Sequence, residues 1–224
     1  MRSGFGPEQT VNAPNPVLSK SAAQPAKKRA TYADLEAVPP HLVAEIIDGE
    51  LVTHPRPAPR HVKASHLMAD ELTGPFERGR GGGPGGWIFM PEPELHFGPE
   101  IVVPDIAGWR RERLTELPET PYLEVVPDWV CEVISPSTEV YDRGAKRRIY
   151  GEAGVAHLWL LSPTARLLEV FGRSHDRWML LATFQDAEEV SAPPFDAIAF
   201  SLGVLWPFDM PDQAVTPAET GSGG

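Results

Sequence analysis

Hydrophobic and polar positions near the start of the chain predict a short helix followed by a hairpin. Thr31 and Asp34 have the spacing of a capping box and predict a helix within residues 31–39. Residues 42–54 are apolar on both sides of Asp48-Gly49, a dipeptide that favours the tight turn of a β-hairpin. We therefore expect two antiparallel strands directly after the helix.

The next segment predicts an amphipathic helix and a connector. The glycine-rich run 79–86 lacks the Gly-Lys-Ser/Thr ending of a phosphate-binding loop, so we interpret it as a connector. Before it, residues 57–76 predict a helix because apolar side chains recur near helical spacing at Val62, Leu67, Met68 and Leu72.

Three further apolar segments predict strands. Residues 87–98 and 101–109 indicate a pair of strands joined by a tight turn near Gly98-Pro99. Residues 128–135 form a nearly continuous apolar run, which is typical of a strand in the centre of a sheet.

The last part of the folded chain predicts one helix and more strands. Residues 141–154 indicate a helix that ends at Gly154. Residues 155–173 predict a strand, a turn and a second strand, and residues 177–184 predict another strand. The order and lengths of these elements favour an α/β domain with a central mixed β-sheet flanked by helices.

Composition sets the limits of the folded unit. Residues 1–30 and 208–224 are rich in small and polar residues without a period, which predicts two disordered tails around one domain at residues 31–207. The N-terminal segment lacks the apolar region of a secretory signal, and no apolar run is long enough to cross a membrane. We therefore expect a cytoplasmic protein. The single cysteine, Cys131, excludes an internal disulfide and a cysteine-based zinc site.

The charge balance limits the kind of nucleic-acid contact that the chain can make. Its 31 acidic residues against 20 Lys and Arg give a formal net charge of −11. Binding of DNA without regard to sequence depends mainly on cationic contacts to phosphate, so the acidic balance argues against a general DNA coat. An enzyme that grips nucleic acid locally is not excluded, because acidic residues that hold metal ions add to the negative total.

Two acidic residues lie within otherwise apolar predicted strands. Asp105 lies in the segment 101–109 and Glu132 in the segment 128–135. A buried carboxylate is costly unless it has a partner. If the two strands are neighbours, the carboxylates converge, and two such groups repel unless they share a proton or bind a cation. Carboxylate oxygens with water suit a hard divalent ion such as Mg²⁺.

Two more residues extend this pattern. Glu45 interrupts an apolar strand in the same way, and Lys146 follows in the predicted helix. Asp142, Lys146 and Tyr150 are spaced four residues apart, so they line one face of that helix. Acidic metal ligands with a lysine are what hydrolysis of a phosphodiester requires, because the metal activates water and the lysine stabilises charge or orients the nucleophile.

At this point the sequence resembles a known superfamily. Pro104-Asp105 followed by Glu132 is similar to the PD-(D/E)xK nucleases, and the stretch 127–163 looks like the Uma-type restriction endonuclease family in particular. The matching pieces, which together span most of residues 31–207, are EIIDGELV, VVPDIAGW, CEVISPST, DRGAKRRIY and AGVAHLWLLSP.

This resemblance implies a restriction-endonuclease-like fold and Mg²⁺-dependent cleavage of DNA, with Mn²⁺ as a substitute. It assigns metal binding to Asp105 and Glu132, with the backbone carbonyl of Val133 as an extra ligand. Glu45 is the acid that assists the metal, and Lys146 is the catalytic lysine. A homodimer is expected, because two sites cut both strands of a duplex most easily.

The chain departs from the superfamily pattern at one position. Ile134, not lysine, stands two residues after Glu132, and in the Uma-type branch the lysine is found on the following helix, where Lys146 stands. The neighbouring arginines are alternatives for the cationic role and weak candidates for contacts with DNA, and Tyr150 either contacts DNA or caps the helix against the core. These arginines are Arg143, Arg147 and Arg148.

Each residue also has a purely structural interpretation. Asp105 can satisfy turn amides after its proline, and Glu132 can form an ion pair with Arg147 or Arg148. Glu45 can face solvent on an edge strand, and Lys146 can belong to a solvated basic face. A weak nucleic-acid-binding module or a protein-interaction domain that keeps the nuclease fold is therefore the alternative to a nuclease.

Overall fold

A six-stranded mixed sheet forms the centre of the molecule. The computed structural model describes Met1 and residues 28–208, so the predicted tails lie outside the described residues except at their inner ends. Within the large sheet only β7 and β8 run parallel, and the other neighbouring pairs are antiparallel. The strand order is β10 (Arg177–Gln185), β9 (Leu167–Ser174), β8 (His157–Ser162), β7 (Trp129–Val133), β6 (Ile106–Arg110) and β3 (Trp87–Pro91). The predicted central strand at 128–135 is confirmed as β7.

A smaller sheet lies beside the large one. Its hairpin turns at Asp48 and Gly49, whose φ angles of 55° and 76° suit a type I′ turn. The predicted hairpin is thus confirmed. The strand order is β2 (Glu50–Pro55), β1 (Leu42–Ile47), β5 (Glu100–Val102) and β4 (Leu95–Phe97), and a separate pair is formed by β11 (Glu189–Val190) and β12 (Phe200–Ser201).

The turn predicted between residues 87–98 and 101–109 is present, but neither predicted strand is continuous. Each predicted strand is broken, so that β4 and β5 pair in the small sheet and β3 and β6 pair in the large one. Glu92 has a positive φ of 45°, and Pro104 lacks the N–H that a continuous ladder needs. The break places Asp105 where the two sheets meet.

Three of the predicted helical segments are present. Thr31 and Asp34 cap α1 (Tyr32–Glu36) reciprocally, as the capping box predicted. The second helix, α2 (Pro59–Leu72), continues into η1 (Thr73–Glu77), and the predicted connector contains η2 (Arg80–Gly82). The third is one helical run ended by Gly154 at φ 99°, hereafter the α3–α4 helix, which consists of α3 (Glu139–Tyr141), η3 (Asp142–Lys146) and α4 (Arg147–Ala153). A last short turn is η4 (Leu202–Leu205).

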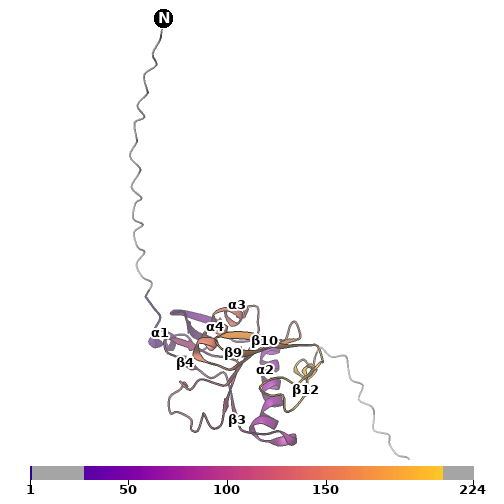
Figure 1. Cartoon of the computed structure of the whole chain (residues 1–224). Coiled ribbons are helices and arrows are strands. Elements are labelled where there is room, and N and C mark those ends of the chain that lie inside the picture. Colours follow the sequence, from indigo (N-terminus) through magenta and orange to yellow (C-terminus); the bar gives the residue numbers. More distant parts are fainter. Residues whose placement is uncertain (2–27, 209–224) are drawn as a thin grey trace, which may run out of the picture.

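The two faces of the large sheet are covered by different helices, and this decides where Glu132 points. Figure 1 shows α2 and the α3–α4 helix on opposite sides of the sheet. Cys131 and its odd-numbered neighbours on β7 pack in one core cluster with α2, whereas Val130 packs in a second cluster with Tyr150 of α4. Because side chains alternate along a strand, Glu132 shares the face of Val130 and is directed toward the α3–α4 helix.

The buried stripe of α2 differs from the predicted one. Ala64, Met68 and Leu72 face the sheet, whereas Val62 is 50% exposed. These three buried positions are four residues apart, and Val62 lies off that stripe. Val62 is therefore an apolar member of the predicted pattern that faces away from the sheet.

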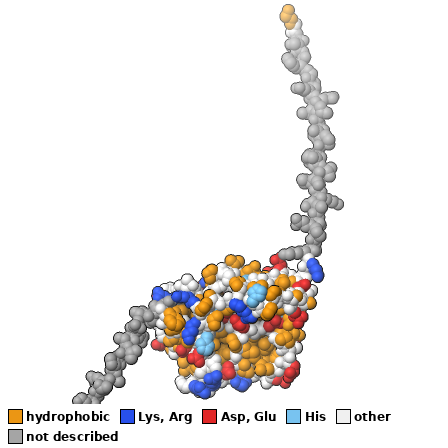
Figure 2. Space-filling view, turned by 180° about the vertical axis from the view of Figure 1, so that it is seen from behind, with side chains coloured by type: hydrophobic (Ala, Val, Ile, Leu, Met, Phe, Trp, Pro, Cys, Tyr) orange, Lys and Arg blue, Asp and Glu red, His pale blue; other side chains and the backbone are white. Residues whose placement is uncertain are grey.

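The surface is mixed in charge. On the face seen in Figure 2, Lys and Arg side chains are scattered among acidic and hydrophobic ones and form no single continuous basic field. Within the part of the chain that the structure describes, none of the helices combines the length and the apolar character needed to traverse a bilayer.

Candidate active site

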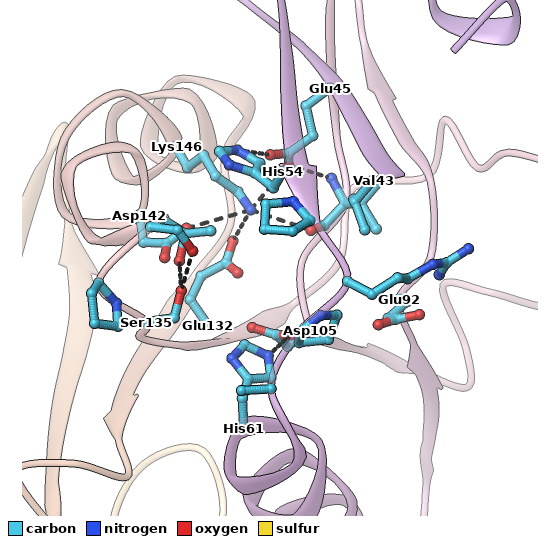
Figure 3. A pocket seen from close by; sticks show the side chains of 18 residues that line it. Val43, Glu45, His54, His61, Glu92, Asp105, Glu132, Ser135, Asp142 and Lys146 are labelled. Carbon is cyan, nitrogen blue, oxygen red and sulfur yellow. Dashed lines mark hydrogen bonds and ion pairs between the residues drawn. The ribbon is translucent and has the colours of Figure 1, made fainter. Parts of the chain in front are cut away.

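A cavity of about 310 Å³ lies where β1, β2, β7, the start of α2 and the α3–α4 helix come together. Figure 3 shows charged side chains from these separate elements directed toward one another. Five carboxylates line the cavity together with one lysine, one arginine and two histidines, namely Glu45, Glu92, Asp105, Glu132, Asp142, Lys146, Arg56, His54 and His61. The structure thus brings together all four residues predicted to be catalytic, although they are far apart in the sequence.

Lys146 is the centre of the upper group in Figure 3. Its Nζ lies 2.9 Å from Glu132 Oε1, 3.0 Å from Glu45 Oε1 and 3.6 Å from Asp142 Oδ1. It also donates to the carbonyl of Val103 at 3.2 Å. Lys146 is only 4% exposed, so it does not belong to a solvated basic face. It is the shared cation of three buried carboxylates.

The electrostatics of this group keep Lys146 charged. Burial alone lowers the pKa of the ammonium, but Glu132 and Glu45 outweigh it and raise the pKa well above its ordinary value. Burial, opposed by Lys146 and reinforced by Asp142, raises the pKa of Glu132 well above its ordinary value. Three buried acids therefore share one cation and retain excess negative charge or a proton.

Glu45 is held more firmly in its ionised form. Burial raises the pKa of this carboxyl, but Lys146, His54 and the Val103 N–H outweigh burial and lower the pKa below its ordinary value. The Val103 N–H donates to Glu45 Oε1 at 2.8 Å. Glu45 belongs to β1 and is 2% exposed, so the interpretation as a solvent-facing edge residue is wrong.

Tyr150 supports Glu132 from the same helix. Its hydroxyl donates to Glu132 Oε1 at 2.5 Å, and the side chain is fully buried. Burial raises the pKa of this phenol well above its ordinary value, and Glu132 adds to the effect. Tyr150 has no exposed surface, so its burial argues against a direct contact with DNA, which stays a prediction. Its alternative interpretation, packing of the helix against the core, describes its position.

Asp105 lies on the other side of the cavity. Its Oδ2 accepts a hydrogen bond from the Val133 N–H at 2.7 Å, and its Oδ1 lies 2.5 Å from His61 Nε2. Val133 follows Glu132 directly, so the two acids meet at the end of β7, as convergence of the strands predicted. Asp105 accepts an amide of the neighbouring strand and an imidazole, not the turn amides of the structural interpretation.

The side chains of the cavity suit a hard divalent cation that needs only one or two protein carboxylates as ligands. Mg²⁺ is commonly held by one or two carboxylates and otherwise keeps its waters. Asp105 and Glu132 provide two carboxylates on one cavity, and burial raises the pKa of Glu132, with smaller contributions from the neighbouring acids Asp142 and Asp105. Among residues 28–208, no group of three or more His, Cys, Asp or Glu forms a ready metal cage. A cation held by these two carboxylates would have to complete its shell with water, substrate or a backbone carbonyl such as that of Val133.

The three arginines of the α3–α4 helix are directed elsewhere. Arg143 forms ion pairs with Glu139 and Glu169, and Arg148 forms them with Asp48 and Glu152. The guanidinium of Arg147 lies 5.8 Å from the ring of Phe171. All three line a separate groove on the outer side of the helix. The alternative interpretation of Glu132, an ion pair with Arg147 or Arg148, is wrong, because Glu132 pairs with Lys146.

Comparison with known proteins settles the family. A family model named Uma2 and described as "Putative restriction endonuclease" matches residues 29–204, most of the chain. The chain belongs to the Uma2 family. An uncharacterized protein of Synechocystis sp. is 31% identical over 81 residues, which cover 36% of this chain and 42% of that protein. The match therefore spans less than half the length of that relative.

A solved structure shows the same fold. A crystal structure described as that of a putative nuclease belonging to DUF820, from Anabaena variabilis, superposes with a TM-score of 0.62 at 20% identity. The match covers 80% of this chain and 98% of that one. The chain thus shares the fold of this solved structure, which agrees with the description of the Uma2 family as one of putative restriction endonucleases.

Sequence reasoning missed two histidines of the site. His54 is buried, with Nε2 3.6 Å from Glu45 Oε2, and His61 contacts Asp105. The seven histidines are scattered and form no ligand motif. The sequence signal that could have identified His54 is its position. His54 lies near the end of the hairpin that carries Glu45 and is opposite Val43 in the β1–β2 register.

Proposed function

We propose that this Uma2 protein is a metal-dependent endonuclease that hydrolyses phosphodiester bonds of DNA. The observation that carries the proposal is the buried Lys146 ammonium, 2.9 Å from Glu132 and 3.0 Å from Glu45, in the cavity that Asp105 also lines. A lysine beside paired carboxylates is the donor set that phosphodiester hydrolysis uses. We further propose that the enzyme acts in the cytoplasm.

Each charged residue of the cavity has its own proposed role. Asp105 and Glu132, with the Val133 carbonyl, would hold Mg²⁺ or Mn²⁺. When bound, such an ion lowers the pKa of a coordinated water and neutralises charge on the phosphate. Lys146 keeps its proton at neutral pH, so it stabilises developing negative charge or orients the attacking water and does not act as a base. Glu45 holds the lysine in place.

A second candidate function is a nucleic-acid-binding or protein-interaction domain that retains the nuclease fold. Its supporting observation is that Lys146 has three acidic partners of its own, while no cage of three metal-binding side chains is found among residues 28–208. In that case the buried group is a structural ion-pair cluster, and removing metal changes nothing.

A cleavage assay on plasmid and single-stranded DNA decides between the two. It compares wild type with Glu132→Ala and Lys146→Ala in Mg²⁺, in Mn²⁺ and in EDTA. Glu116→Gln, which changes an exposed acid outside the cavity, is the matched control. We expect metal-dependent cleavage in wild type and control and none in the two site variants. Absence of cleavage and of metal binding in folded wild type favours the second candidate.

The state of assembly is a separate proposal. We propose a homodimer, because two copies place one site on each strand of a duplex. The molar mass from light scattering of the eluting full chain tests this, and a mass of one chain at micromolar concentration contradicts it.

A further inference from the structure

His61 reaches the cavity because of where α2 begins. Pro59 occupies the first helical position, for which its fixed φ is suited, and His61 follows in the same turn. Buried Ala64 and Met68 anchor this helix against the sheet. The His61 side chain is consequently 11% exposed and lies against Asp105, a residue 44 positions later in the chain.

Asp105 is fixed at both carboxylate oxygens and at its backbone. His61 Nε2 contacts Oδ1 at 2.5 Å, and the Val133 N–H donates to Oδ2 at 2.7 Å. The Glu92 N–H donates to the Asp105 carbonyl at 3.0 Å. The hydrogen bond from the Val133 N–H holds Oδ2 of the carboxylate. The position of Oδ1 then depends on His61.

The second imidazole nitrogen is in a different situation. His61 Nδ1 is buried and has no hydrogen-bond partner among the described residues. A neutral imidazole that donates from Nε2 keeps Nδ1 as an acceptor, so the contact with Asp105 selects one tautomer. The ring therefore has one strong directional contact, which is the one to Asp105.

We propose that His61 is a positioning residue that, by donating from Nε2 to Asp105 Oδ1, holds this carboxylate in the orientation that binds a divalent cation. The inference rests on the proposed role of Asp105 as a metal ligand. A carboxylate oxygen accepts a hydrogen bond and binds a cation at the same time, since it has two lone pairs. Groups that orient a ligating side chain in this way typically change metal affinity about 10–100-fold.

Binding of MnCl₂ alone to the full chain, measured by titration calorimetry without DNA, tests the inference. The variants are His61→Leu, which removes the donor, and His61→Gln, which keeps an N–H donor near the position of Nε2. His66→Leu is the matched control, because His66 is an exposed histidine of the same helix outside the cavity. Thermal unfolding of each variant verifies that it is folded.

We expect the Mn²⁺ dissociation constant to rise about 10–100-fold in His61→Leu, to recover largely in His61→Gln and to stay unchanged in His66→Leu. A purely structural role lowers the unfolding temperature but leaves the Mn²⁺ affinity of the folded protein unchanged, which overturns the inference. A His61→Gln variant that binds Mn²⁺ as weakly as His61→Leu also overturns the inference. If wild type binds no Mn²⁺ and cuts no DNA, the proposed function fails as well. If wild type does both and His61→Leu binds normally, only this inference fails.

Discussion

Lys146 Nζ lies 2.9 Å from Glu132 Oε1, although the lysine is on a helix and the glutamate on strand β7. Ile134, two residues after Glu132 on the same face of the strand, packs in the core cluster with Tyr150. The α3–α4 helix covers this face and brings the Lys146 ammonium next to Glu132, which is the placement that the proposed role of Lys146 requires.

Removal of Lys146 tests this relationship through stability as well as activity. Lys146→Met leaves three buried carboxylates without their cation, and we expect the free energy of unfolding at neutral pH to fall by about 3–5 kcal/mol. Adding Glu132→Gln removes one of these charges and should restore part of the loss, while cleavage stays absent. Urea unfolding and the cleavage assay measure the two effects.

Arg148→Met is the control for that experiment. Arg148 lies on the same helix and also has two acidic partners, but its side chain is 43% exposed. Exposed pairs of this kind are worth about 1 kcal/mol or less. Equal losses in the two variants contradict the assignment of Lys146 as the cation of a buried cluster.

Tyr150→Phe separates support of Glu132 from contact with DNA. The change removes the hydroxyl that donates to Glu132, and a hydrogen bond to a charged group contributes about 1.5–3 kcal/mol to stability. We expect a lower turnover number, because Glu132 is less well fixed, and an unchanged dissociation constant for DNA measured in EDTA. A tenfold weaker affinity for DNA with the fold intact is the result that contradicts the burial argument.

The sequence predicts individual elements better than their junctions. The apolar run at 128–135 identifies β7, and the capping box identifies α1, because these signals are local. The break that divides β3 from β4 and β5 from β6 was not predicted, since it depends on the meeting of two sheets. The apolar pattern that predicted α2 included Val62 and not Ala64, because the small Ala64, which lies on the buried stripe, carries a weaker hydrophobic signal.

The same distinction applies to the site. Glu132 and Asp105 are visible in the sequence, because an acid within an apolar strand needs a partner wherever the strand lies. His61 is not, since its contact with Asp105 depends on how α2 lies across the sheet. Tyr150 was placed correctly on the face of Lys146, but its burial follows from packing of the α3–α4 helix, which spacing alone does not give.

His157 is a source of pH-dependent stability just below neutral pH, outside the site. Burial, reinforced by Arg110, lowers the pKa of His157 below its ordinary value, so the folded protein keeps this imidazole neutral. The unfolded chain takes up the proton first as the pH falls below about 6.5. The contribution is therefore fully present above that pH and is lost as the pH falls through the lower pKa of the folded state.

His157→Gln should accordingly reduce the difference in stability between pH 7.5 and pH 5.5. Urea unfolding at the two pH values measures this difference, and His66→Gln, which changes an exposed histidine, serves as the control. If the stability of wild type and of His157→Gln changes equally between the two pH values, the pH dependence comes from other groups.

Metal binding should raise the thermal stability of the folded protein. A ligand that binds only the folded state stabilises it by RT ln(1 + [L]/Kd), about 2.7 kcal/mol when its concentration is a hundred times Kd. We expect the unfolding temperature to rise with MnCl₂ and to return to its starting value in EDTA. Asp105→Asn should abolish the rise, because an amide is a poorer ligand for a hard cation than a carboxylate. Asp70→Asn, on an exposed position of α2, should preserve it. A rise of equal size in Asp105→Asn places the cation elsewhere, because the carboxylate that the Val133 N–H and His61 hold at the cavity then has no part in binding it.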